Sequence, residues 1–303
     1  MEENIKISVV VTAYNKQDSI IKCVESILNS TYKNLEIIIV EDKSTDNTLK
    51  VIKDNLLKDS RVKLVEHTIN KGAGLSRRDG IKTATGEFVS LIDGDDYISK
   101  DFIESLVTRQ KETQADIVSG GITNINEDGS TDIKLFQEKV SEGNQKLLDY
   151  GKGTIIFLNN KIVRRSLYDI IEYSDKRYCE DTPVIIPLLY HANKVAYVSN
   201  AGYYYYHSQN SLTGKVSMIK HNIACADCMV FLRTYFKNIP DAKFYLEMLS
   251  FNQFIGYLYT AVMQDIKPED LKECLPEYIN SVKYLLTTIV SPNANENSGK
   301  INN

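Results

Sequence analysis

The chain has 303 residues, of which 43% are hydrophobic and 25% are charged, and its formal net charge is −4. These values are typical of a globular protein with a substantial core, and they exclude a wholly disordered chain. The mild acidity gives no support to nucleic-acid binding. No apolar segment approaches the ~20 residues of a membrane-spanning helix, and the N-terminus lacks a signal-peptide pattern. We therefore expect a cytoplasmic protein, with peripheral association at the inner face of the cell membrane left open.

Strand-like and helical segments alternate along the first 125 residues. Apolar, β-branched runs predict strands at 5–15, 35–42, 62–67, 87–93 and 115–125. Segments with helical spacing lie between them, at 19–30, 44–57, 74–84 and 102–113. Such alternation indicates βαβ units, an α/β fold class and a largely parallel sheet, whose ligands bind at the carboxyl ends of the strands.

The pattern changes in the second half of the chain. It weakens between 126 and 145, where N-E-D-G-S indicates a turn or hairpin, and extended character returns at 194–207. Beyond Met218 helical spacing dominates, at 222–236, 244–263 and 276–290, before a polar tail that we expect to be disordered, 291–303. We predict two parts, residues 1–215 and 216–303, with the apolar stripes of the second forming a core and a homo-oligomer interface.

Two of the five cysteines, Cys225 and Cys228, form a C-x-x-C motif, and His221 lies four residues before it. A structural zinc site usually needs four ligands, and no second pair lies nearby in the sequence. The surrounding pattern is helical. We therefore expect neither a disulfide framework nor a metal or redox role here.

Several motifs occur in a fixed order: SVVVTAYN, VEDKSTDNT and NKGAGLSRRDGIKTATGEFVSLIDGDD, then more weakly NNKIVRRSLY, CEDTP and YYYYHSQNSLT. Together they resemble the family 2 glycosyltransferases with a GT-A fold. The resemblance implies a Rossmann-like, mostly parallel sheet flanked by helices. The helical C-terminal extension beyond Met218, expected from its spacing, falls outside the resemblance. Residues 1–97 would be the nucleotide-binding half and 98–215 the acceptor half. It also implies sugar transfer from a nucleotide donor, with a divalent metal and inversion at the anomeric carbon.

Three carboxylates, Asp93, Asp95 and Asp96, follow the strand at 87–93. A hard cation binds clustered carboxylate oxygens and cancels their repulsion, whereas an isolated acidic triplet could be a solvated turn. By the resemblance, the three aspartates hold Mn²⁺ or Mg²⁺, which stabilises the charge that grows on the leaving nucleoside diphosphate. Asp95 and Asp96 would then lie nearest the ribose and the metal, with Asp93 supporting them and Gly94 beside the donor.

The ends of the first two strands would recognise the base. Tyr14 can stack on a pyrimidine ring, and Thr12 and Ala13 can contact the donor; an aromatic side chain packed at the sheet edge is the alternative for Tyr14. Asp42 can accept the ring N3–H of uracil, a donor that cytosine lacks. The sequence therefore predicts a UDP-sugar donor.

Three basic residues complete the candidate donor site. Arg77 falls where the family carries an arginine that could pair with the diphosphate or base, although the neighbouring Arg78 leaves open which side chain points inward. Lys161 could neutralise donor or acceptor charge, with a surface lysine as the alternative. For His207 we favour hydrogen bonds to its surroundings over a metal or phosphate contact.

A second acidic site is Glu180–Asp181, in RYCEDTP. It resembles the E-D motif of the family, whose aspartate is the general base. An acceptor hydroxyl is a poor nucleophile until a carboxylate takes its proton as the new bond forms. A helix cap is the alternative role for this pair.

We therefore expect an inverting, metal-dependent transferase of a hexosyl or N-acetylhexosaminyl group, acting in cell-surface polysaccharide biosynthesis. Its acceptor would be a hydroxyl of a glycan, a lipid-linked glycan, a polymer or a protein. A catalytically silent nucleotide-sugar-binding module is the alternative. A dinucleotide oxidoreductase would need G-x-G-x-x-G after the first strand, where TAYNKQ stands instead.

Overall fold

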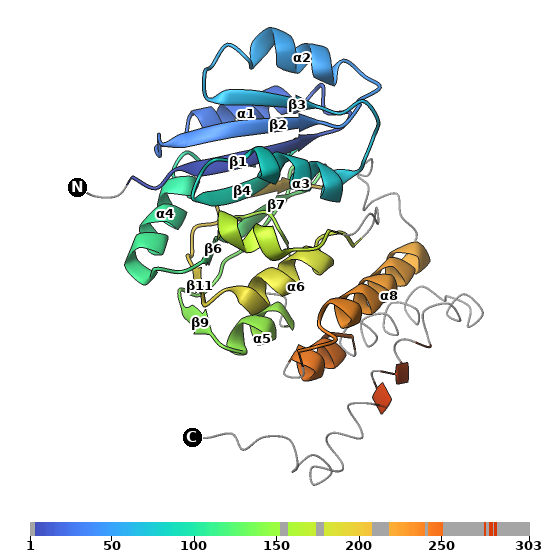
Figure 1. Ribbon diagram of the computed structural model, residues 1–303. Helices are drawn as coiled ribbons and strands as arrows, with labels where there is room; N and C mark the ends of the chain where they lie inside the picture. The colour runs from blue at the N-terminus through green and yellow to red at the C-terminus, as the bar shows by residue number, and fades with distance from the viewer. Residues whose placement is uncertain are drawn as a thin grey trace. The chain divides into compact units, whose positions relative to one another are not determined.

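The computed structural model describes residues 4–151, 157–173, 179–207, 218–239 and 242–250, together with 276, 279–280 and 282–283. The chain divides into two compact units, Met1–Lys215 and Val216–Asn303. The first unit is built around a large, mostly parallel sheet with helices on its faces (Figure 1). This confirms the α/β fold class predicted from the alternating pattern.

The central sheet has eight strands in the order β3-β2-β1-β4-β10-β6-β11-β9. They are β1 (Ile7–Ala13), β2 (Leu35–Glu41), β3 (Val62–Glu66), β4 (Phe88–Asp93), β6 (Ile117–Ser119), β9 (Val140–Glu142), β10 (Lys161–Arg164) and β11 (Lys194–Tyr197). Strand β1 is parallel to β2 and β4, whereas β10 is antiparallel to both of its neighbours. Every residue of β1 and β2 is buried, which explains why their sequences are almost continuously apolar.

Four helices connect the strands of the first half: α1 (Ile20–Leu28), α2 (Thr48–Asn55), α3 (Ala73–Thr83) and α4 (Phe102–Thr113). Alternate strand residues point to opposite faces of a sheet. Val9 and Val11 of β1 share a hydrophobic core with Ile20 of α1. On the other face, Gly80 of α3 comes so close that a Cβ there would lie 2.3 Å from Val10 Cγ1. The absence of a side chain at Gly80 therefore sets how closely α3 approaches the sheet.

The single strand predicted at 115–125 is wrong, because the structure divides this segment between two sheets. Strand β6 belongs to the central sheet, and β7 (Ile122–Ile125) belongs to a second sheet in the order β5-β12-β7-β8. The chain crosses between them at Gly120 and Gly121. A Cβ at Gly120 would lie 2.6 Å from the Phe102 ring, and one at Gly121 would lie 2.5 Å from the Lys134 carbonyl oxygen.

The other strands of the second sheet are β5 (Tyr97–Ile98), β8 (Thr131–Lys134) and β12 (Tyr203–Tyr206). Strands β7 and β8 are antiparallel, which confirms the hairpin indicated by N-E-D-G-S. The described residues of the first unit also form α5 (Gln145–Gly151), the 3-10 helix η1 (Arg165–Ile170) and α6 (Thr182–His191).

In the second unit, α8 (Met218–Tyr235) confirms the helix predicted at 222–236, and residues 242–250 are also helical. Three predicted segments lie wholly or partly outside the described residues. They are residues 251–263 of the helix predicted at 244–263, most of the helix predicted at 276–290, and the tail at 291–303. Among the residues that are described, no helix is both long and apolar enough to cross a bilayer.

Candidate functional site

The carboxyl ends of β1, β2 and β4 meet at one edge of the central sheet because these strands are parallel. Thr12 lies beside Asp93 in the strand register, and its hydroxyl donates a hydrogen bond to Asp93 Oδ1 at 2.9 Å. The backbone N–H of Asp42 donates to the Ala13 carbonyl oxygen at 2.9 Å. Tyr14 follows β1 and is 42% exposed. The predicted convergence of these residues at one edge is confirmed.

Asp93 is surrounded by hydrogen-bond donors. Arg77 Nη2 donates to both of its oxygens, at 2.9 and 3.1 Å, and Asn159 Nδ2 donates to Oδ2 at 3.0 Å. Burial alone would raise the pKa of Asp93, but the Arg77 charge and these hydrogen bonds hold it below its usual range. Asp93 is therefore a stable anion.

The next two residues of the loop adopt a compact turn. Gly94 N donates to the Thr12 carbonyl oxygen at 2.9 Å, and a Cβ at this position would lie 2.8 Å from the same oxygen. Asp95 forms an ion pair with the Lys16 ammonium. Sequence analysis did not single out Lys16, although its place just after TAYN was a signal that it lies at the sheet edge.

Asp96 is only 1% exposed and has other partners than Asp95. It accepts hydrogen bonds from the Tyr203 hydroxyl at 2.5 Å and from Tyr206 N at 3.1 Å. Burial, together with the neighbouring charges of Asp93 and Asp95, raises the pKa of Asp96 well above its usual value. The three aspartates of the loop thus occupy three different environments.

The second acidic pair faces the same arginine. Arg77 Nη1 donates to Asp181 Oδ1 at 2.7 Å and lies 3.4 Å from Glu180 Oε1. Asp181 Oδ2 accepts a longer hydrogen bond, of 3.3 Å, from Leu158 N. Burial raises the pKa of both carboxyls despite the Arg77 charge, that of Glu180 to about 7. Although Asp181 precedes α6, its side chain makes no capping hydrogen bond, so the helix-cap alternative is wrong.

Helix α3 settles which arginine points inward. Arg77 is 5% exposed and joins Asp93 to the Glu180–Asp181 pair, whereas Arg78 is half-buried and pairs with the adjacent Asp79. Arg77 Nε is buried and has no hydrogen-bond partner among the described residues. The guanidinium is thus committed chiefly to carboxylates of the protein; its pairing with a donor diphosphate or base stays a prediction.

Asp42 is buried and holds the loop that leads into α3. Its two oxygens accept hydrogen bonds of 2.8 Å from Lys71 N and Gly72 N, and Oδ1 lies 2.7 Å from His67 Nδ1. A carboxylate has about four lone-pair sites, so three of them are occupied. Base recognition by Asp42 stays a prediction that depends on the remaining one.

Lys161 is 1% exposed, not at the surface. Its ammonium donates to the carbonyl oxygens of Phe157 and Asn159 and to Asn160 Oδ1, and burial lowers its pKa to about 7. It therefore shapes the turn before β10. That turn positions Asn159, whose Nδ2 also donates to the Tyr203 hydroxyl at 2.9 Å. Asn159 was missed, although it stands in the same NNK stretch.

His207 lies at the end of β12 and is exposed. Its Nε2 is 3.1 Å from Asn124 Oδ1, and its ring makes an edge contact with Tyr205. This agrees with the histidine hydrogen-bonded to its surroundings that the sequence favoured. Residues 208–217, which follow in the sequence, lie outside the described residues.

Within the described ranges, no three His, Cys, Asp or Glu side chains are grouped closely enough to hold a metal by themselves. The acidic loop explains this in part, because Asp93 is paired with Arg77 and Asp95 with Lys16. Cys225 and Cys228, the pair of the C-x-x-C motif, are buried residues of α8.

A sequence model described as "Glycosyl transferase family 2" matches residues 8–171, more than half of the chain. Glycosyltransferase GlyG of Streptococcus pneumoniae serotype 4 is 30% identical over 217 residues, which are 68% of this chain and 72% of GlyG. The chain belongs to glycosyl transferase family 2, a family of glycosyltransferases.

Other relatives are matched over shorter shares of their length. The poly(ribitol-phosphate) beta-glucosyltransferase of Bacillus spizizenii is 36% identical over 47% of this chain and 25% of its own. WfaP of Escherichia coli, a UDP-Glc:alpha-D-GlcNAc-diphosphoundecaprenol beta-1,3-glucosyltransferase, is 44% identical over 30% of this chain and 36% of its own. The crystal structure of S. aureus TarS 1-349 in complex with UDP-GlcNAc superimposes with a TM-score of 0.73 at 22% identity, over 94% of this chain and 82% of TarS. The fold is therefore shared with TarS.

Proposed function

We propose that this protein transfers a sugar from a UDP-sugar to a hydroxyl group of an acceptor, with inversion at the anomeric carbon. The observation that carries the proposal is the position of Arg77, which joins the aspartate at the end of β4 to the carboxylate pair before α6. A leaving-group site and a proton acceptor must lie within reach of one sugar for direct displacement. We assign the leaving-group site to the acidic loop after β4 and the proton acceptor to the pair before α6.

The donor proposal rests on the exposed Tyr14 and on the relatives. The names of WfaP and of the TarS complex include a UDP-sugar, and both support UDP as the carrier here. Tyr14 would stack on the uracil, and the unused lone pair of Asp42 would accept its N3–H. We expect UDP to bind about tenfold more tightly than CDP, equivalent to about 1.4 kcal/mol. Calorimetry that gives equal affinities would remove Asp42 from base recognition.

The residues of the acidic loop fit a divalent cation whose remaining ligands would come from the diphosphate of the donor. Mg²⁺ is usually held by one or two carboxylates together with substrate phosphates, so three protein ligands are not required. We assign this role chiefly to Asp95, with Asp96 beside it, because Asp95 is paired with the partly exposed Lys16, which a cation can displace. Asp93 is instead held by the buried Arg77 and by hydrogen bonds from Asn159 and Thr12. When bound, Mn²⁺ or Mg²⁺ would neutralise charge on the leaving diphosphate. Mn²⁺ binding followed by electron paramagnetic resonance should strengthen when UDP is added and weaken in Asp95→Asn; if UDP has no effect, this assignment is wrong.

Asp181 is the proposed base. It would take the acceptor's hydroxyl proton while the acceptor oxygen bonds to the anomeric carbon and the bond to the diphosphate breaks. Arg77 is a positioning residue that fixes the orientation of Asp181 Oδ1. The acceptor class is supported by the relatives' names, which include a polymer and a lipid-linked sugar.

The test is a panel of UDP-sugars incubated with the purified protein and Mn²⁺, with released UDP as the readout. We expect slow hydrolysis of one or a few sugars, and its loss when the metal is chelated. An active family 2 enzyme assayed in parallel checks the conditions. Binding of a UDP-sugar by calorimetry, with no release of UDP from any sugar, would favour the silent binding module.

A further inference from the structure

A pocket of about 460 Å³ opens in the first unit between α3 and η1. Its position is fixed by Arg165, whose N and Nε donate hydrogen bonds of 2.9 Å to the carbonyl oxygens of Glu87 and Gly86. Both carbonyls precede β4, whereas Asp93 lies at the other end of that strand. The pocket therefore lies alongside α3, and its lining does not include the carboxylates that Arg77 joins, although the charges of Arg77 and Asp181 act on Tyr168 in the lining.

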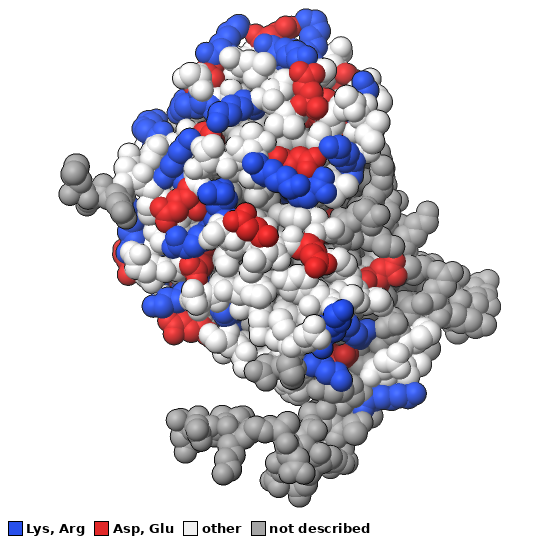
Figure 2. Space-filling model, in the orientation of Figure 1, with Lys and Arg blue, Asp and Glu red and all other residues white. Residues whose placement is uncertain are grey.

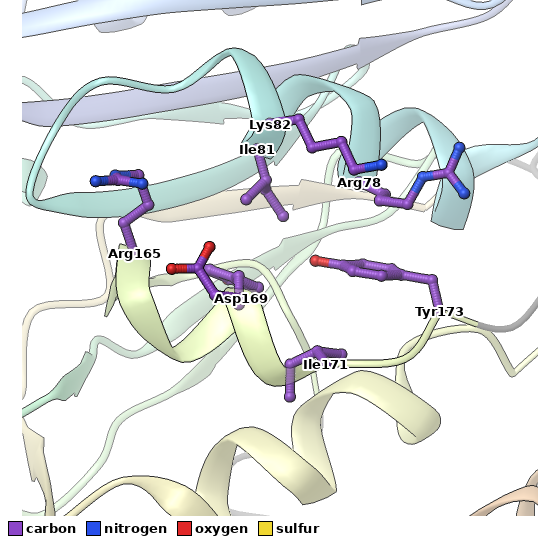
Figure 3. Close-up of a pocket in the computed structure, with 8 residues that line it drawn as sticks. Arg78, Ile81, Lys82, Arg165, Asp169, Ile171 and Tyr173 are labelled. Carbon is purple, nitrogen blue, oxygen red and sulfur yellow. The ribbon is translucent and has the colours of Figure 1, made fainter.

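The lining of the pocket is rich in positive charge. Arg78, Lys82 and Arg165 line it, against one carboxylate, Asp169. Figure 3 shows Arg78 and Lys82 extending from α3, with the Tyr173 ring across from them. Basic side chains also gather over α3 in the space-filling view (Figure 2). Arg78 is paired with Asp79, but no ion pair or hydrogen bond to a described residue engages the Lys82 ammonium or the carboxylate of Asp169. The pocket thus presents positive charge, above all that of Lys82, which no described carboxylate neutralises.

Two tyrosine hydroxyls in the lining have unmet hydrogen-bonding capacity. Tyr168 is 4% exposed, and within the described part of the chain neither its hydroxyl nor that of Tyr173 has a partner. A ligand atom that accepts a hydrogen bond from either hydroxyl would satisfy it, after a small movement of the side chains that enclose the oxygen. Burial raises the pKa of both hydroxyls, so both are hydrogen-bond donors at neutral pH.

Cations and hydroxyl donors together suit a phosphate group, whose oxygens accept several hydrogen bonds. The single carboxylate, Asp169, suits a ligand that also carries hydroxyl groups, and Ile81 and Ile171 give apolar contact for a carbon chain. We propose that this pocket binds the phosphate ester of a polyol or sugar, and that it anchors a phosphate-bearing part of the acceptor. The role in acceptor binding rests on the proposed transferase function; the binding itself does not.

The binding test uses glycerol 3-phosphate, followed by calorimetry with UDP and Mg²⁺ present at saturation so that the donor site is blocked. We expect binding to weaken about tenfold in both Lys82→Gln and Tyr168→Phe, since a hydrogen bond to a charged group contributes about 1.5 kcal/mol or more. Lys111→Gln, which removes an exposed lysine from α4, is the matched control and should bind like the wild type. Tyr168→Phe removes only an unpartnered oxygen, so it should fold. Wild-type affinity in both pocket variants, or no binding to the wild type, would overturn the proposal.

A second comparison identifies the source of the phosphate. Geranyl diphosphate is titrated under the same conditions; tighter binding than glycerol 3-phosphate indicates a lipid-linked acceptor, and weaker binding indicates a polyol-phosphate polymer. UDP-sugar hydrolysis without acceptor should be unchanged in Lys82→Gln. If the wild type binds glycerol 3-phosphate but hydrolyses no UDP-sugar, the transferase proposal fails while the phosphate site stands. If hydrolysis occurs but no phosphate ester binds, only the pocket proposal is wrong.

Discussion

Asp93, at the end of β4, and Asp181, before α6, are both paired with Arg77, yet their pKa values shift in opposite directions. Asp93 accepts hydrogen bonds from Arg77, Asn159 and Thr12, and its pKa is lowered. Asp181 is buried beside the same guanidinium, but from the other described residues it receives only a 3.3 Å hydrogen bond, from Leu158 N, and its pKa is raised. Burial dominates at Asp181, where donors are fewer and the Asp93 charge also raises the pKa, so Asp181 rather than Asp93 is the carboxyl that can take up a proton.

The strongest test of this difference is Asp181→Asn. The amide keeps the side chain's volume but cannot accept the acceptor proton, and general-base catalysis contributes about 10²- to 10⁴-fold. We expect single-turnover sugar transfer to fall by about that factor, while UDP affinity and melting temperature change little. Asp54→Asn, on the exposed face of α2, is the control. A folded Asp181→Asn protein that transfers sugar at the wild-type rate would place the base elsewhere, with Glu180 as the next candidate.

Arg77→Lys tests the shared cation itself. Lysine keeps the charge but cannot make the forked contacts that join Asp93 to Asp181, and a hydrogen bond to a charged group contributes about 1.5–3 kcal/mol. If that contribution is made in the transition state, transfer should fall about 10- to 100-fold.

The same variant should also change the pH profile. The Arg77 charge opposes the effect of burial on the pKa of Asp181, so weaker pairing should raise that pKa and move the acid limb of the profile to higher pH. Arg109→Lys on α4 is the matched control. Lower activity with an unmoved acid limb would show that Arg77 does not act through Asp181.

Of these variants, Glu180→Gln should have the smallest effect, a change in the free energy of unfolding. Burial and the Asp181 charge raise the pKa of Glu180 from an ordinary 4.5 to about 7. Between these values the folded state binds more protons than the unfolded state, so the free energy of unfolding falls as pH rises through this range. At about pH 8 we expect the variant to be more stable than the wild type by about 1–3 kcal/mol, and to lose this advantage near pH 4.5. Thermal unfolding at the two pH values checks this, with Glu112→Gln as control; an equal difference at both would contradict it.

The fold of the first hundred residues could be predicted because strands buried on both faces have almost continuously apolar sequences. The change of sheet at Gly120 could not be predicted, because apolar residues continue on both sides of it. Only the packing of Phe102 against Gly120 shows why no side chain fits there. Local pattern identifies an element, but it does not identify which of two sheets the element joins.

The candidate site shows a similar limit. Residues at strand ends were predicted to meet because parallel strands end at a common edge, and Thr12 and Asp93 do so. The partners of each side chain depend on contacts between segments far apart in the sequence. Arg77 to Asp181 spans 104 positions, and nothing local signals it. For the same reason Lys161, expected to meet a ligand, is instead enclosed by its own turn.

Gly80 has a consequence for how this chain tolerates substitution. A methyl group there would collide with Val10 and come within 2.9 Å of Val40 Cγ2, so alanine would displace α3 from the sheet at a cost of about 1–3 kcal/mol. Arg77 stands on the same helix, three positions earlier, so this displacement would carry the guanidinium away from both acidic groups. A library that randomises α3 and is selected for activity should therefore return glycine at position 80 and many residues at the exposed position of Thr83. The missing side chain at Gly80 thus keeps α3 close enough to the sheet for the Arg77 guanidinium to reach both acidic groups.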